Sequence, residues 1–407
     1  MNCRHCQNNL EYLFLDLGFA PPSNAYRSKD DLNKAELNYP LRIMVCDRCW
    51  LVQTEDFVDA DEMFSPEYAY FSSTSISWLE HAAKYSKMIQ KKLDLDTKSL
   101  VIEIASNDGY LLKNFVKSGI PCIGIEPTKG TADAAQELNI PVHCDFFNST
   151  LADKLVNEDK KSDLVIGNNV YAHVPDINDF TLGLKKILKP HGTITLEFAY
   201  LLNLIQQNEF DTVYHEHFSY LSLHAVKSIF ERVGLQIYDV EELSTHGGSL
   251  RIYGCHQQIG FDTKDRVNEQ LQKEEDMGLL ELETYVHFQK QAERVKNKLL
   301  DFLNEQKMHG KSVAGYGAAA KGNTLLNYAG VKPDLLSFVC DAAPSKQGKY
   351  LPGSNIPIFL PDHIKAQKPD FILILPWNIT EEITKQLSYV KDWGCKFVRA
   401  IPKLEII

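Results

Sequence analysis

The densest group of chemically active side chains in the sequence is the run Tyr214, His215, Glu216 and His217, which Asp211 precedes. A histidine titrates near neutral pH, and a neighbouring carboxylate can fix its tautomer and raise its basicity. In an extended chain the tyrosine and glutamate would face one side and the histidines the other, so a turn must bring the four together. We interpret the run as a proton-transfer site. Metal binding and surface hydrogen bonding are the alternatives, although the His-Glu-His spacing differs from the i, i+4 spacing of helical zinc sites.

Residues 101–109, with the sequence VIEIASNDG, predict a buried strand that runs into a glycine-ended polar loop. The apolar residues suit a strand covered on both faces in a parallel sheet, and residues 110–118 then predict an amphipathic helix. A buried carboxylate is costly unless it accepts hydrogen bonds, so we expect Glu103 to meet a ligand or loop amides. The candidate cofactor contacts here are Glu103, Ala105, Asn107, Asp108 and Gly109.

Two further acidic residues end the strands that should follow. Glu126, with Pro127 after it, ends the predicted strand CIGIEP at the place where a βαβ unit has an acid for two ribose hydroxyls. Asp145 stands where the next strand should end, beside Phe146 and a second ring that together could sandwich a base. Any one of these loops is common in ordinary βαβ units, but three acidic strand ends in order favour a cofactor site.

The same edge of the predicted sheet should carry three more polar residues. The strand predicted over 164–166 is followed by Asn168 and Asn169, and His173 lies a few residues further on. Open α/β sheets bind ligands at the carboxyl ends of their strands. We therefore count all three among the cofactor-binding candidates.

Four cysteines near the N-terminus have the spacing of a metal site. Cys3 and Cys6 form one Cys-x-x-Cys pair, and Cys46 and Cys49 form another. Four thiolates in two such pairs suit tetrahedral Zn²⁺ in a closed structural site, and two unrelated pairs are the alternative. His5 lies inside the first pair, and we expect it to be a bystander rather than a ligand.

A segment rich in hydroxyl and aromatic side chains follows, from Tyr68 to Trp78. The serines and threonine of residues 72–77 suit the N-terminal cap of a helix. Alternatively, the segment is a lid from which Tyr68 or Tyr70 reaches a polar substrate. The spacing alone favours neither interpretation.

A second glycine-rich strand-loop-helix unit, GYGAAAKGN, occupies residues 315–323. Asp341 follows it at the distance of a dinucleotide fingerprint, but the glycine pattern departs from that fingerprint, so NAD binding is the weaker interpretation. Lys321 at a helix start fits a phosphate better, and the loop that contains Lys346 has the same character. Between the two α/β units, residues 266–307 predict one or two connecting helices.

The chain has 407 residues and a formal charge of -11, which suits two or three domains and argues against a nucleic-acid partner. Apolar runs fall short of the roughly 18 residues of a membrane span, and the N-terminus lacks a signal-peptide core, so we expect a cytoplasmic protein without a membrane partner. The nine cysteines should then be thiols or metal ligands. The expected fold is α/β, with a zinc-binding domain over 1–66 and Rossmann-like domains over 67–258 and 259–407. The oligomeric state is open, a monomer included.

Taken in order, Glu103, Glu126 and Asp145 resemble the acidic strand ends of class I S-adenosylmethionine-dependent methyltransferases, although that family usually has glycine at the position of Ala105. The whole order of parts is similar to the sugar C-methyltransferase family. The resemblance covers almost the whole chain and rests on the two Cys-x-x-Cys pairs and on EIASNDG, NNVYAHVPD, VYHEHFSY, THGGSLR and GYGAAAKGN. It implies a zinc domain, a central class I methyltransferase sheet and a C-terminal Rossmann-like domain.

The resemblance also implies a reaction, the transfer of a methyl group from S-adenosylmethionine to C3 of a nucleotide-linked (dTDP or GDP) 4-keto-6-deoxy sugar in branched-chain deoxysugar biosynthesis. It implies that His217 is the base that forms an enolate, with Glu216 as its orienting partner. Tyr214 and a tyrosine from positions 68 and 70 would hold the sugar or the enolate oxygen. Zinc would be structural.

In the C-terminal domain, the resemblance implies that the glycine-rich loop with Lys321 holds the pyrophosphate of the sugar nucleotide. The residues implied to bind this part of the substrate are Gly317, Lys321, Asn323 and Lys346. An O- or N-methyltransferase acting on another small acceptor is the main alternative. An NAD-dependent oxidoreductase and a non-catalytic zinc scaffold are weaker ones.

Overall fold

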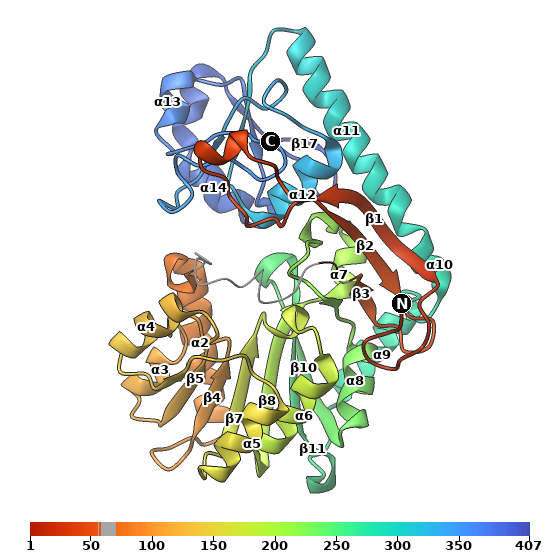
Figure 1. Ribbon diagram of the computed structural model, residues 1–407, viewed down its shortest axis with the longest axis vertical. Coiled ribbons are helices and arrows are strands. Elements are labelled where there is room, and N and C mark those ends of the chain that lie inside the picture. The colour runs from red at the N-terminus through yellow and green to blue at the C-terminus, as the bar shows by residue number, and fades with distance from the viewer. Residues whose placement is uncertain (56, 58–70) are drawn as a thin grey trace.

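The computed structural model describes residues 1–55, 57 and 71–407, so Tyr68 and Tyr70 lie outside the described residues. Figure 1 shows a central sheet flanked by helices, a second α/β unit above it, and the N-terminal strands β1 and β2 along one side. Within the described ranges, no helix is long and apolar enough to cross a membrane.

The N-terminal sheet is completed by a strand from the middle of the chain. β1 (Tyr12–Ala20), β2 (Tyr39–Val45) and β3 (Val52–Thr54) pair antiparallel in that order. The fourth strand is β9 (Ser219–Tyr220), which pairs with β3 and directly follows the Tyr-His-Glu-His run. The N-terminal sheet therefore holds part of the segment in which the sequence predicts proton transfer.

The central sheet has the order β10-β11-β8-β7-β4-β5-β6. Its strands are β4 (Val101–Ile104), β5 (Cys122–Ile125), β6 (Val142–His143), β7 (Ser162–Asn168), β8 (Leu188–Ala199), β10 (Leu235–Leu243) and β11 (Ser249–His256). β11 runs antiparallel to both its neighbours, and the others are parallel to one another. The chain builds outward in both directions from β4, so the carboxyl end of β4 is a switch point where such sheets bind ligands.

Alternate residues of the central strands enter two cores, because successive side chains of a strand point to opposite faces. Val101 packs with α2 (Ile76–Lys92) and α3 (Lys113–Lys117), whereas Ile102 packs with α5 (Ser149–Asn157) and α6 (Ile177–Ile187). The remaining helices of this part are α4 (Lys129–Glu137), α7 (Leu201–Gln206) and α8 (Leu223–Arg232). Helices thus cover both faces of the sheet, and the predicted Rossmann-like fold is confirmed.

Two predicted helical segments differ in the structure from what the sequence indicates. The helix expected over 110–118 begins only at Lys113, because Asn107 and Gly109 adopt left-handed backbone angles and the turns continue to Leu112. The segment expected to form one or two helices forms three, α9 (Asp265–Asp276), α10 (Leu282–Val286) and α11 (Phe288–Met308). Gly278, with a φ of 76°, interrupts the pattern after α9.

The C-terminal domain is the second α/β unit, and α11 runs along the side of the molecule towards it (Figure 1). Its sheet has the order β14-β13-β12-β15-β16-β17, in which only the last pairing is antiparallel. The strands are β12 (Val313–Tyr316), β13 (Val339–Cys340), β14 (Ile358–Phe359), β15 (Phe371–Ile374), β16 (Lys396–Arg399) and β17 (Glu405–Ile406), and the helices are α12 (Ala320–Ala329), α13 (His363–Gln367) and α14 (Thr380–Gln386).

Candidate active site

A cavity of about 760 Å³ lies at the carboxyl ends of the central strands and extends to the C-terminal domain. Residues from all three parts of the chain line it. The lining residues that the sequence singled out are Ala105, Asn107, Glu126, Pro127, Asp145, Phe146, Asn168, Asn169, His173, Tyr214, Glu216, His217, Lys321 and Lys346. Among the described residues, five other candidates are not part of the lining, namely Glu103, Asp108, Gly109, Gly317 and Asn323.

The loop after β4 is held in a tight conformation by the end of β5. Ala105 and Asn107 have φ values of 55° and 49°, and a Cβ atom at Gly109 would lie 2.5 Å from Ile140 Cδ1. Glu126 accepts hydrogen bonds from the backbone N–H of Asn107 at 2.9 Å and of Thr128 at 3.0 Å. Burial raises the pKa of the Glu126 carboxyl, and these two N–H groups oppose the shift. Its carboxylate thus shapes the loop while it lines the cavity.

Two carboxyl groups lie beneath this loop rather than in the cavity. Glu103 is 1% exposed, and neither of its carboxyl oxygens has a partner in the part of the chain that the structure describes. Burial and the nearby Glu126 and Asp108 raise its pKa well above the ordinary value. Asp108 accepts from Ser73 N at 3.1 Å, which joins the loop to the segment before α2. Sequence reasoning expected Glu103 to contact a ligand or loop amides, whereas the structure leaves it buried behind them.

The remaining groups on the β5 to β7 side fit a nucleoside cofactor. Asn168 ends β7 and is 8% exposed, and its amide oxygen and nitrogen have no partners among the described residues. Phe146 is 39% exposed beside Asp145, so its ring face is open to a base. Phe147 instead packs edge-on against Phe180, with ring centroids 5.2 Å apart. This second ring of the predicted pair packs into the core and also lines the cavity.

The Tyr-His-Glu-His run makes the turn that its sequence requires. His217 N donates to Tyr214 O at 3.0 Å, and the Tyr214 and His217 rings lie with their centroids 4.0 Å apart. Tyr214, Glu216 and His217 line the cavity. His215 faces away from it, with its Nε2 atom 3.2 Å from the carbonyl oxygen of Pro40.

The ring of His217 is oriented by a backbone carbonyl. Its Nδ1 atom lies 2.9 Å from Thr212 O, and because a carbonyl can only accept, Nδ1 carries the proton and Nε2 is the basic nitrogen of the neutral ring. We expected Glu216 to orient this ring, but Glu216 Oε1 accepts from the Asn24 side chain at 2.7 Å. Thr212 supplies the contact at Nδ1, and Glu216 is tied to the N-terminal domain.

The N-terminal sheet holds the other end of the same turn. Thr54 N donates to Phe218 O at 3.1 Å, and the Thr54 hydroxyl donates to the carbonyl of His217. Phe218 N donates to Ala172 O at 2.8 Å, next to His173. The turn is therefore fixed between the zinc-binding domain on one side and the end of the central sheet on the other.

His173 is a second imidazole in contact with His217, with ring centroids 4.6 Å apart. Its Nδ1 donates to Glu216 O at 2.8 Å. Burial lowers the pKa of His173 to about 4, so the ring is neutral at physiological pH. A neutral His173 adds no positive charge that would reduce the basicity of its neighbour.

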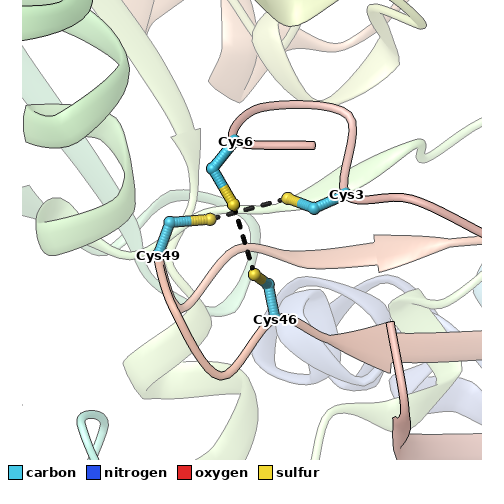
Figure 2. A group of neighbouring side chains, drawn as sticks. All are labelled: Cys3, Cys6, Cys46 and Cys49. Carbon is cyan, nitrogen blue, oxygen red and sulfur yellow. Dashed lines mark hydrogen bonds between the residues drawn. The ribbon is translucent and has the colours of Figure 1, made fainter. Parts of the chain in front are cut away.

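Figure 2 shows the four sulfur atoms of the N-terminal domain converging on one point. The Cys3–Cys49 and Cys6–Cys46 Sγ distances are both 3.5 Å, and all four atoms lie within 4.8 Å of one another. Zinc–sulfur bonds of about 2.3 Å in a tetrahedron require sulfur atoms about 3.8 Å apart, so this set fits Zn²⁺. His5 is a bystander as expected, because its ring nitrogens contact Asn178 Oδ1 at 2.8 Å and Ser228 Oγ at 3.0 Å.

Two lysines stand on the C-terminal wall of the cavity. Lys321 Nζ donates to Asn378 Oδ1 at 2.9 Å and lies 4.5 Å from the ring centroid of Trp377. Burial lowers its pKa, and the carboxyl groups of Asp211 and Glu209 oppose the shift. Lys346 Nζ donates to Ala318 O at 2.8 Å, before the start of α12.

The other candidates of this domain have structural contacts. Asp341 accepts from Ala318 N at 2.6 Å and from Ala343 N at 2.7 Å, so both of its oxygens hold their own loops. A Cβ atom at Gly317 would lie 2.4 Å from Pro376 Cδ, so glycine permits this close approach. Asn323 is 1% exposed and donates to Ser23 O at 2.6 Å, which ties α12 to the N-terminal domain.

Sequence reasoning missed four residues around the proton-transfer run: Asn24, Glu209, Thr212 and Asn378. Each lines the cavity. Glu209 and Thr212 stand within a few residues of the run, and their proximity was the only available signal. Asn24 and Asn378 come from opposite ends of the chain, and a single sequence offers no signal for either.

Comparison with known proteins matches three family models to the chain. A zinc binding domain model matches residues 3–64, a methyltransferase domain model matches 77–240, and a model of a C-methyltransferase C-terminal domain matches 244–402. The C-methyltransferase NovU of Streptomyces niveus is 32% identical over 405 residues, which cover 100% of this chain and 96% of NovU. The ubiquinone biosynthesis O-methyltransferase of Bartonella tribocorum is 28% identical over 107 residues, 25% of this chain and 41% of that protein.

Among solved structures, the PH0226 protein from Pyrococcus horikoshii OT3 has a TM-score of 0.38 at 16% identity, over 46% of this chain and 94% of that chain. The sequence similarity to NovU covers more of the chain, because it includes the zinc-binding, central and C-terminal domains. The chain therefore belongs to the C-methyltransferase family that its motifs resemble, and it is an S-adenosylmethionine-dependent C-methyltransferase with Zn²⁺ as its structural metal.

Proposed function

We propose that this enzyme methylates C3 of a nucleotide-linked 4-keto-6-deoxy sugar, with His217 as the base, in branched-chain deoxysugar biosynthesis. The observation that carries the proposal is the 2.9 Å contact between His217 Nδ1 and Thr212 O, which makes Nε2 the basic nitrogen of a ring that lines the cavity. The same cavity has the loop after β4 on one side and Lys321 on the other.

The chemistry begins with a proton on carbon. A ketone at C4 acidifies the C3–H bond, so a single base within hydrogen-bond reach can take that proton. In the proposed step His217 Nε2 receives the proton, and the electron pair of the C3–H bond moves into the enolate whose oxygen is that of the C4 ketone. When bound, S-adenosylmethionine supplies a methyl group that bonds to C3 as its bond to sulfur breaks.

Donors near His217 would stabilise the negative charge on the enolate oxygen. Tyr214 lies against the His217 ring and lines the cavity, so its hydroxyl is one candidate donor. Tyr68 and Tyr70 remain predictions for the same task. Fixed donors at a developing oxyanion commonly give one of the largest contributions to catalysis, about 10²- to 10³-fold for each donor.

The cofactor contacts are proposed on the β4 to β7 side of the cavity. Glu126 would accept hydrogen bonds from ribose hydroxyls, and the exposed ring of Phe146 would stack on the base beside Asp145. Asn168 would form hydrogen bonds with the cofactor through its amide, which has no partner among the described residues. Asn169 and His173 complete this set. Glu103 would support the loop after β4 from beneath and would not contact the cofactor.

The nucleotide would extend toward the C-terminal domain. Ala319 is the N-cap of α12 and Ala320 is its first residue, and both line the cavity together with Lys321 and Lys346. A helix N-terminus with two cations suits a pyrophosphate, because backbone N–H groups and positive charge converge there. The contacts of Gly317 and Asn323 support a role for them in shaping this wall rather than in touching the substrate.

The test is incubation with S-adenosylmethionine and a panel of dTDP- and GDP-linked 4-keto-6-deoxy sugars in heavy water, followed by mass spectrometry. A mass gain of one methyl group identifies the reaction and the nucleotide together. Deuterium uptake at C3 without methylation would support the enolate step and would indicate that the panel lacks the correct sugar. Neither change across the panel would contradict the proposal and favour another acceptor.

The histidine assignment is tested in the same assay with a matched pair of variants. His217→Ala should lose both deuterium uptake and methyl transfer. His215→Gln is the control, because His215 is the neighbouring imidazole that contacts Pro40 instead of the cavity, and its activity should stay within a few fold. Normal turnover by the first variant would exclude His217 as the base.

A further inference from the structure

One buried carboxyl on the substrate side of the cavity has no role in the proton transfer described above. Glu209 stands just before the short 3-10 helix Phe210–Thr212 and is among the lining residues. It is 3% exposed, and its Oε1 atom has no hydrogen-bond partner within residues 1–55, 57 and 71–407. A buried polar oxygen without a partner is costly unless a ligand supplies one.

The charged neighbours of Glu209 have hydrogen bonds to other residues, although Asp211 Oδ1 has no partner among the described residues. Asp211 Oδ2 accepts from Trp377 Nε1 at 2.8 Å, and Lys321 donates to Asn378 at 2.9 Å. On the other side the backbone of Gly247 approaches so closely that a Cβ atom there would lie 2.7 Å from Glu209 Oε1. The carboxyl is thus confined on the side of Gly247, and the residue also lines the cavity.

The confined carboxyl is largely uncharged. Burial raises the pKa of Glu209 to about 8, with a contribution from the nearby Asp211 and opposition from Lys321. A protonated carboxyl has one O–H donor and retains acceptor capacity, as a sugar hydroxyl does. The two groups can therefore form a mutual hydrogen bond without the burial of a net charge.

Glu209 is also close to the proposed base. Its carbonyl oxygen accepts from Thr212 N at 3.0 Å and from Thr212 Oγ1 at 2.7 Å. Thr212 O in turn receives the Nδ1 hydrogen of His217. The carboxyl of Glu209 is near Lys321, whose charge opposes the rise of its pKa. A substrate that reaches from His217 to Lys321 would therefore have its sugar ring next to Glu209.

We propose that Glu209 is a substrate-binding residue that forms a hydrogen bond with a ring hydroxyl of the sugar and selects for sugars that carry it. This inference rests on the proposed function, because it takes C3 of the sugar to lie at His217. Glu209 holds the ring, and the proton transfer remains with the histidine.

The test compares Glu209→Leu and Glu209→Gln with the wild-type enzyme on substrates that have the C2 and C3 hydroxyls and on 2-deoxy and 3-deoxy analogues. Glu209→Leu should lower kcat/KM about 10- to 100-fold on the fully hydroxylated sugar, because the bound hydroxyl loses its partner. On the analogue that lacks that hydroxyl, the same variant should match the wild type within a few fold. Glu209→Gln keeps a donor and an acceptor and should restore most of the lost activity.

Asp211→Asn is the matched control. It alters the second carboxyl of the cluster, keeps an acceptor for Trp377, and leaves the cavity lining unchanged. Its kcat/KM should stay within a few fold of the wild type on every substrate. A selective loss in Asp211→Asn equal to that of Glu209→Leu would overturn the proposal in favour of a general electrostatic effect.

Four further results would overturn the assignment. Equal losses for Glu209→Leu on all analogues, or a melting temperature below that of the wild type with no selective loss, would show a structural role for Glu209. Methylation by the wild type with no effect of either Glu209 variant would reject this inference alone. Absence of methylation by the wild type across the panel would reject the proposed function and this inference with it.

Discussion

The buried carboxyl of Glu209 should make the folding stability of this enzyme fall as pH rises from about 5 to 8. Its pKa is raised from the ordinary 4.5 to about 8 in the folded protein. Between these values the folded state keeps a proton that the unfolded state has lost, so stability declines with increasing pH. Each pKa unit corresponds to about 1.4 kcal/mol, which gives an upper limit of about 5 kcal/mol for the whole shift.

Glu209→Leu should remove this contribution. Relative to the wild type, the variant should gain up to about 4 kcal/mol of stability between pH 5 and pH 8, about 1.4 kcal/mol for each pH unit. The neighbouring Asp211 titrates lower, since burial raises its pKa from 3.8 to about 6, so its own effect should be largely complete by pH 6. The decline in folding stability above pH 6 is therefore assigned to Glu209.

The assay is urea or thermal unfolding of the wild type, Glu209→Leu and Asp211→Asn at pH 5.0, 6.5 and 8.0. For a domain of this size, each 1 kcal/mol corresponds to a change of about 2–4 °C in melting temperature. A difference between Glu209→Leu and wild type that stays constant over this pH range would refute the reasoning. It would mean that the carboxyl titrates normally and is not confined as described.

His217→Ala should lower methyl transfer by about 10²- to 10⁴-fold while the calorimetric Kd for S-adenosylmethionine changes only a few fold, and a lost cofactor affinity would argue against a base. Cys46→Ser should lower the zinc content and the melting temperature together, and unchanged zinc by elemental analysis would contradict a four-thiolate site. Lys321→Met should raise KM for the nucleotide sugar about 10- to 100-fold with a smaller effect on kcat, whereas an unchanged KM would remove it from the pyrophosphate site. Asn168→Ala should weaken S-adenosylmethionine binding about 10-fold without loss of thermal stability, and tight binding would show that its amide is not used.

The sequence was sufficient to place polar residues on the β4 to β7 side of the cavity, because local patterns determine their positions. A buried strand that ends in a polar residue predicts the position of that residue, since parallel strands all end on one edge of the sheet. Glu126, Asp145 and Asn168 came to line the cavity for this reason. The same pattern was insufficient for Glu103. It gives the position of the residue at the strand end, but not the side of the loop on which the carboxyl is buried.

The partners of the proton-transfer run could not be predicted in the same way. The expected partner of His217 was the adjacent Glu216, but the turn directs the carboxylate toward Asn24 and brings the carbonyl of Thr212 to the ring. A backbone carbonyl carries no residue-type signal. Asn24 is far away in sequence, and its contact depends on the packing of the N-terminal domain against the central one.

Strand β9 has a consequence for the evolution and engineering of this enzyme. Its residues Ser219 and Tyr220 are encoded with the central domain but belong to the N-terminal sheet, where they pair with Gln53 and Val52. A chimera that exchanges the N-terminal domain between two relatives would pair β9, and the turn before it that contains His217, from one parent with β3 from the other. Functional recombination should therefore require that the segment from His217 to Tyr220 be inherited together with β3, although most of the central domain separates them in the gene.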